Sequence, residues 1–159
     1  ACSDTTLGTA DKELDLSGAH LSYGDFKDAT FTGTGAIRLN GAGLANADLS
    51  GSELRASAYG DGGNATIDLT EADLTNANLT SSDLKAAGWE HGTIDLTEAN
   101  LANADLRGAE LYAYSSAGDA TIDLTEADLA NADLSGAELR AYAYGAATID
   151  LTEADLANA

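Results

Sequence analysis

The residues of this chain with the clearest potential for chemistry are aspartates inside a repeated five-residue motif. The motif Thr-Ile-Asp-Leu-Thr begins at residues 66, 93, 121 and 148. If its copies stack as adjacent strands, the aspartates form one column with neighbours about 4.8 Å apart. The column contains Asp68, Asp95, Asp123 and Asp150. Because Ca²⁺ prefers carboxylate and carbonyl oxygens, this column is a candidate for weak Ca²⁺ binding.

The repeated acidic residues also repel one another. A second column would contain Glu71, Glu98, Glu126 and Glu153. Like charges about 4.8 Å apart repel by roughly 1 kcal/mol in water. Salt screening or diffuse counterions can offset this repulsion, so a bound cation is not required. The threonines on either side of each aspartate form a regular hydroxyl array, so an ice-binding surface is a further alternative.

The remaining reactive residues do not indicate an enzyme. His20 and His91 lie in different repeats, and neither recurs. The sequence has no glycine-rich phosphate motif and no Cys/His cluster with metal-ligand spacing. We therefore expect no catalytic residue, and no cofactor other than the candidate Ca²⁺.

The single cysteine has three interpretations. Cys2 has no partner within the chain, which excludes an internal disulfide framework. It is an inert thiol, or it forms a disulfide with another chain. The third interpretation is a lipid anchor, because Ala1-Cys2-Ser3 is similar to the end of a bacterial lipobox.

The composition is strongly acidic. The chain has 27 Asp and Glu residues against 7 Lys and Arg, which gives a formal net charge of −20. A phosphate-binding surface needs clustered Lys and Arg, so nucleic-acid binding is disfavoured. No apolar run approaches the roughly 20 residues of a transmembrane segment. The chain contains no methionine, so we expect a processed, exported protein that is extracellular or on the cell surface.

The elements that position these residues follow from a five-residue period. Leucines stand at positions 124, 129, 134 and 139, and alanines stand at 127, 132 and 137. A helix advances about 100° per residue, so this period builds no apolar stripe. A flat strand would send alternate leucines to opposite faces. The chain must instead turn a corner once per pentad, so that four short faces make a square rung with Leu and Ala inside.

These pentads resemble a known repeat. The motifs EADLA, NADLS and GAELR between residues 126 and 140, with EANLA and NADLR between 98 and 107, resemble the A(D/N)LXX unit of the pentapeptide-repeat family. The resemblance implies a right-handed quadrilateral β-helix. We therefore predict an all-β, right-handed parallel β-helix (solenoid) of about five to six rungs, of the pentapeptide type. Residues 14–159 form this single domain, and residues 1–13 form a non-repeat lead-in.

Each coil is longer than four pentads. Ile67, Ile94, Ile122 and Ile149 are separated by 27, 28 and 27 residues. The surplus predicts an additional strand that enlarges one side of the rung. Aromatic side chains gather in these added segments, where they either stack from rung to rung or contact a partner. They are Tyr59, Trp89, Tyr112, Tyr114, Tyr142 and Tyr144, and the basic residues Arg55, Lys85, Arg107 and Arg140 lie in or near the same segments.

The two ends of the solenoid carry the main functional hypothesis. A solenoid exposes strand edges and an apolar cross-section at each end. We expect an uncapped C-terminus at which Ile149, Leu151 and Leu156 begin an incomplete rung, and an N-terminal face with Leu14 and Leu16. Head-to-tail pairing of these faces predicts a homo-oligomer that grows into a filament or surface appendage.

Three alternatives stay open. Some members of the family resemble a DNA duplex in shape and charge and engage type II topoisomerases. The resemblance therefore implies an acidic DNA-mimicking binding module as the first alternative. A cation- or ice-binding surface solenoid is the second. An engineered, consensus-like solenoid is the third, since the repeats from Thr121 onward are nearly identical.

Overall fold

A computed structural model describes residues 5–9, 11–60 and 62–159, which contain β-strands and no helix. The strands form two parallel sheets of six strands each. The odd-strand sheet contains β1 (Thr6–Gly8), β3 (Thr30–Thr34), β5 (Glu53–Ala58), β7 (Asp83–Gly88), β9 (Glu110–Ser115) and β11 (Glu138–Tyr142). The even-strand sheet contains β2 (Leu14–Asp15), β4 (Ala36–Arg38), β6 (Asn64–Asp68), β8 (His91–Asp95), β10 (Asp119–Asp123) and β12 (Ala147–Asp150).

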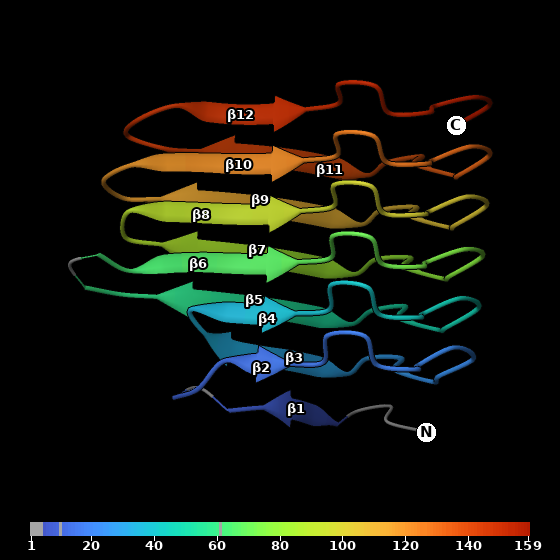
Figure 1. The fold of residues 1–159 in the computed structure, drawn as a ribbon, viewed down its shortest axis with the longest axis horizontal. Helices are drawn as coiled ribbons and strands as arrows, with labels where there is room; N and C mark the ends of the chain where they lie inside the picture. The colour runs from blue at the N-terminus through green and yellow to red at the C-terminus, as the bar shows by residue number, and fades with distance from the viewer. Residues whose placement is uncertain (1–4, 10, 61) are drawn as a thin grey trace.

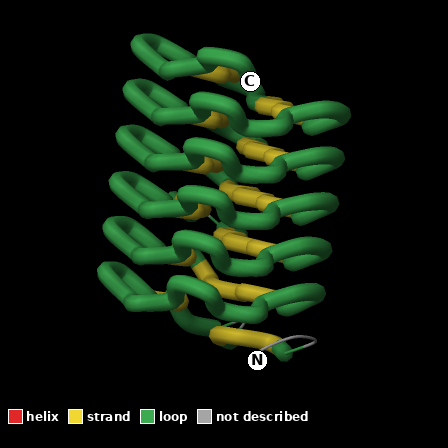
Figure 2. Tube along the Cα trace, turned by 90° about the vertical axis from the view of Figure 1, so that its right-hand side faces the viewer, coloured by secondary structure: helices red, strands yellow, loops and turns green. Residues whose placement is uncertain are grey.

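Successive coils stack in register. Each strand pairs in parallel with the strand one coil away, so that Ile94 lies between Ile67 and Ile122. Figure 1 shows the rungs stacked from the N-terminus to the C-terminus, and Figure 2 shows the same repeated coil from the side. The predicted all-β parallel solenoid is confirmed.

Each coil has a part that is built from pentads, which we call the square part. Corners recur every five residues in this part. One residue per pentad adopts the left-handed backbone conformation, as at Glu71 (φ 56°), Asn76 (φ 56°) and Ser81 (φ 55°). Asparagine and glycine enter this region most readily, which explains their frequency at the corner position. Between corners, single bridges such as Asp73 to Asn100 pair one coil with the next. The corner once per pentad, which the leucine period predicts, is confirmed.

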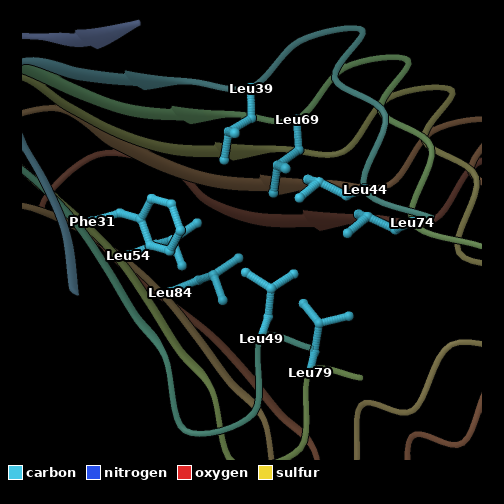
Figure 3. Close-up of a pocket in the computed structure, with 9 residues that line it drawn as sticks. All are labelled: Phe31, Leu39, Leu44, Leu49, Leu54, Leu69, Leu74, Leu79 and Leu84. Atoms are coloured by element: carbon cyan, nitrogen blue, oxygen red, sulfur yellow. The ribbon is translucent and has the colours of Figure 1, made fainter. Parts of the chain in front are cut away.

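The interior is filled by stacked leucines and isoleucines. Ile94 is 0% exposed and Leu101 is 1% exposed. Figure 3 shows Phe31 and eight leucines from neighbouring coils, whose side chains point toward one another inside the solenoid. They leave a void of only about 10 Å³, roughly the space that one water molecule needs. The interior between these coils therefore has no room for a larger ligand.

The added segment of each coil forms a two-sheet extension on one side of the square part, as Figure 1 shows. An odd strand runs outward, turns, and returns as the next even strand. The two sheets approach closely near these turns. A Cβ atom on Gly88 would lie 2.6 Å from the carbonyl carbon of His91, and one on Gly92 would lie 2.7 Å from that of Tyr114. The predicted additional strand and enlarged side are confirmed, and glycine allows this close approach at Gly88 and Gly92.

The solenoid starts earlier than predicted. Leu7 of β1 pairs with Phe31 of β3, so part of the lead-in over residues 1–13 is the first strand of the odd-strand sheet. This strand has three residues and a single inward leucine, so it carries no pentad pattern. Cys2 lies outside the described residues.

Two buried serines interrupt the alanine column at one inward corner. Ser52 and Ser82 hold the position that Ala109 holds in the next coil, and neither hydroxyl has a hydrogen-bond partner among the described residues. A buried hydroxyl without a partner destabilises a fold. Ser52→Ala and Ser82→Ala are therefore each expected to raise the free energy of unfolding by about 1 kcal/mol in urea denaturation.

Ser115→Ala is the matched comparison for this prediction. Ser115 is also buried, but its hydroxyl donates a hydrogen bond to the carbonyl of Glu90 at 2.7 Å. Its removal is expected to lower the free energy of unfolding. A loss of stability in Ser52→Ala as large as in Ser115→Ala would contradict the prediction.

Candidate functional site

The outer face of the even-strand sheet carries the predicted column of aspartates. The strand register places Asp68 beside Asp95, Asp95 beside Asp123, and Asp123 beside Asp150. Each Oδ1 accepts a hydrogen bond from the N–H of the threonine two residues later, at 2.9–3.1 Å. In three of the four coils the hydroxyl of the same threonine also donates to that oxygen, at 2.6–2.7 Å.

These hydrogen bonds tie the aspartates to their own turns. The hydroxyl of Thr152, followed by its N–H, holds the pKa of Asp150 below its ordinary value, so this carboxylate is ionised at neutral pH. Across residues 5–9, 11–60 and 62–159, no group of three or more His, Cys, Asp or Glu side chains is arranged to hold a metal ion. The candidate Ca²⁺ column and the ice-binding surface both stay predictions. In either case the carboxylates and several threonine hydroxyls are already joined by hydrogen bonds.

The outer face of the odd-strand sheet is chemically different. Its outward side chains form three columns that run along the stack of coils. The first column is acidic, the second combines cations with a tyrosine, and the third changes from small residues to tyrosines. The columns contain Glu53, Asp83, Glu110 and Glu138; Arg55, Lys85, Tyr112 and Arg140; and Ser57, Ala87, Tyr114 and Tyr142.

The charges on this face largely cancel. Arg55 Nε lies 3.0 Å from a carboxylate oxygen of Glu53, and Arg140 pairs with Glu138. Lys85 Nζ lies 5.2 Å from the centre of the Tyr112 ring, within the range of a cation–π contact. Exposed pairs of this kind contribute little to stability. Their consequence is a nearly uncharged face on a strongly acidic molecule.

Tyrosines gather on the same face. The rings of Tyr112 and Tyr114 are parallel to within 5°, with centres 6.3 Å apart. The ring of Tyr142 lies 5.7 Å from that of Tyr112. Burial raises the pKa of Tyr112 above its ordinary value, and the neighbouring Tyr114 and Tyr142 raise it further.

The structure brings together only part of the predicted aromatic surface. Tyr114 and Tyr142 lie on the odd-strand face, and Tyr59 stands beside it in the loop after β5. Trp89 and Tyr144 lie instead in the turns that join the two sheets. Lys85 and Tyr112, which the sequence places in the added segments, also lie on the odd-strand face.

The solenoid end formed by β11 and β12 exposes positions that are buried one coil earlier. Ile149 is 42% exposed and Leu156 is 47% exposed. The corresponding Ile122 and Leu129 are 0% and 1% exposed. Leu151 is exposed as well, and at the opposite end Leu14 and Leu16 are only partly buried. The residues predicted for self-association therefore lie on the two apolar cross-sections.

The two histidines are not brought together. His20 forms a bridge with Gly43 in the square part, whereas His91 lies on β8 beside Asp119. Within the parts of the chain that the structure describes, no helix has the length and apolar character needed to cross a membrane.

The repeats match a known family model. This model, described as pentapeptide repeats, matches eight copies over residues 67–87, 94–112 and 122–141. The chain is a β-solenoid that contains pentapeptide repeats over these residues. The stretches between the matches contain the turns that join the two sheets, where this solenoid departs from bare pentads. No curated protein sequence matches it significantly.

Several solved structures are similar to this solenoid. A pentapeptide-repeat protein of the Arabidopsis thaliana thylakoid lumen is 27% identical, covering 75% of this chain and 70% of its own, with a TM-score of 0.24. HetL, a pentapeptide-repeat protein involved in heterocyst differentiation regulation in the cyanobacterium Nostoc, is 21% identical, with coverages of 96% and 85% and a TM-score of 0.27. Trypsin-treated QnrB1, a plasmid-mediated fluoroquinolone resistance protein, is 18% identical, with coverages of 94% and 75% and a TM-score of 0.23. Scores this low transfer no function to the chain.

Proposed function

We propose that this chain is a non-enzymatic, exported structural protein whose copies join head to tail through the ends of the solenoid. The assembly would be a filament or a surface appendage. The observation that supports the proposal is the common register of the coils, which keeps the inward columns of both sheets continuous from β1 and β2 to β11 and β12. Strands stacked in this way can add a further strand from another copy.

The two ends are complementary because all coils share one register. Leu7 of β1 starts the inward column that ends at Leu139 of β11. Leu14 of β2 starts the column that ends at Ile149 of β12. A second copy placed with its β1 against β11 and its β2 against β12 would continue both sheets in parallel.

This joint has the symmetry of an open assembly. The contact joins the β1 and β2 end of one copy to the β11 and β12 end of another. Because these two surfaces differ, the contact is head-to-tail and leaves a free end after each addition. Stacking along a straight axis does not close into a ring, and the expected product is a filament. Free strand edges supply hydrogen bonds to the joint, and the exposed leucines and isoleucines supply apolar burial.

A charge placed inside the joint tests the proposal. Ile149→Lys puts an ammonium group into the apolar cross-section, where burial without a partner is strongly unfavourable. We expect this variant to stay monomeric at concentrations at which the unchanged chain assembles, as measured by sedimentation velocity. Thr148→Lys is the matched control, because Thr148 lies on the same strand but faces outward. Equal assembly of the two variants, or no assembly of the unchanged chain, would contradict the proposal.

An acidic binding module is the second candidate. The aspartate column of the even-strand sheet repeats once per coil along a rod, an arrangement that supports mimicry of DNA toward a type II topoisomerase. This candidate requires no contact between copies. Persistent monomers in the sedimentation experiment would therefore favour it over the filament.

A further inference from the structure

We infer that the outer face of the odd-strand sheet binds a neutral, extended polysaccharide in a groove that runs along the axis of the solenoid. The ligand class is a β-linked glycan without charged groups. This site is separate from the solenoid ends, so it does not depend on the proposed self-association.

The groove is formed by small outward side chains beside larger ones. Ser57 and Ala87 form its floor in consecutive coils. Tyr59 stands between two hollows. One, of about 360 Å³, extends over Thr32 and Ser57, and the other, of about 220 Å³, lies between Tyr59, Lys85 and Tyr114. The hollows follow one another across β3, β5, β7 and β9, so the groove suits a linear ligand rather than a compact one.

The walls of the groove offer flat aromatic surface with few polar groups. Tyr59 is 85% exposed, and the parallel rings of Tyr112 and Tyr114 continue the wall toward the C-terminus. Ligand sites combine such apolar and aromatic area with a small number of polar groups that fix orientation. A pyranose ring matches this pattern, because its C–H face packs on an aromatic ring while its hydroxyls reach polar side chains. Thr32, Thr34, Ser57 and Lys85 are the hydroxyl and amino side chains, besides the tyrosines, that line the two hollows.

The charge distribution selects a neutral ligand. The outward side chains of β5, β7, β9 and β11 include four carboxylates and three cations, and the arginines are paired with carboxylates. By contrast, β6, β8, β10 and β12 contain five aspartates and no Lys or Arg. A polyanion would be repelled by a chain of net charge −20, and a polycation would be drawn to the aspartate face. On the odd-strand face the opposite charges largely cancel, so this face attracts neither a polyanion nor a polycation. The ligand that suits it is an uncharged polymer.

The repeat of the fold suits a repeating ligand. Successive coils present equivalent positions about 4.8 Å apart. An extended β-linked glycan advances one sugar ring over a similar length. Successive rings can therefore occupy successive coils, with the tyrosines of β9 and β11 as the stacking positions at one end of the groove.

Affinity electrophoresis in native gels tests the inference. The probes are hydroxyethylcellulose, galactomannan and xylan, each cast separately into the gel. We expect at least one of these polymers to retard the unchanged chain, and Tyr59→Ala and Tyr114→Ala each to weaken the apparent affinity by about tenfold. Tyr23→Ala is the matched control, because Tyr23 is also highly exposed but lies in the square part of the first coil. It should bind as the unchanged chain does.

A second variant separates loss of binding from loss of folding. Ser57→Gln keeps every aromatic ring and fills the floor of the groove, so it should abolish retardation while the melting temperature stays unchanged. Lack of retardation of the unchanged chain by all three polymers would overturn the inference. Equal weakening by Tyr23→Ala and Tyr59→Ala would overturn it as well. Because retardation is compared between monomeric variants at low concentration, failure of the filament proposal would leave this result unaffected.

Discussion

Gly88→Ala is expected to destabilise the solenoid by about 3 kcal/mol or more, as measured by urea denaturation. A Cβ atom at this position would lie 2.6 Å from the carbonyl carbon of His91 and still closer to its oxygen. Both obstacles are backbone atoms of the facing even strand, so no side-chain rotation can relieve the clash. The two sheets would have to separate at the turn between β7 and β8, where the neighbouring coils also pack.

Gly43→Ala is the control that isolates this effect. Gly43 has an ordinary backbone conformation, and the nearest atom to an added Cβ would be Ser22 Oγ at 3.5 Å, a normal contact. Its replacement should change the free energy of unfolding by less than about 1 kcal/mol. Similar losses in Gly43→Ala and Gly88→Ala would show that close approach of the sheets is not what requires glycine.

Leu101→Ala is expected to lower the free energy of unfolding by about 2–5 kcal/mol. Leu101 is 1% exposed in the middle of the stack, and its neighbours above and below are held in register by single bridges and backbone hydrogen bonds between coils. They cannot collapse into the space that the deleted methyl groups leave, so most of the void persists. Because each coil contacts only its neighbours, we also expect unfolding to become less cooperative.

Leu156→Ala is the matched variant at the end of the stack. Leu156 occupies the place of Leu101 two coils later, but it is 47% exposed. At concentrations that keep the chain monomeric, its loss should be about 1 kcal/mol or less. Equal losses at the two positions would mean that Leu156 is buried in the species being measured.

The fold could be predicted from the sequence because one period dominates it. Leucines five residues apart are incompatible with a helix or a flat strand, and the corners at Glu71, Asn76 and Ser81 are the direct result. The 27- to 28-residue spacing of the isoleucines also predicts the additional strand. Strand β1 could not be foreseen, since three residues with one leucine are too few to show a period.

The candidate sites were only partly predictable, for a geometric reason. The aspartate column follows from register alone, and the structure has it as predicted. Which side chains lie on the odd-strand face depends on where each strand ends and its turn begins. That boundary leaves Tyr142 on the sheet and moves Tyr144 into a turn. The groove floor was also missed, because Ser57 and Ala87 matter through their small size and have no chemistry of their own.

Electron microscopy of the unmodified chain over a concentration series tests the central claim most directly. Head-to-tail joining predicts unbranched filaments whose length grows with concentration. Their axial repeat should be that of one stack of six strands, about 29 Å at a spacing of about 4.8 Å. Single short rods at every concentration, or closed oligomers of fixed size, would contradict the claim that the ends of this solenoid join copy to copy.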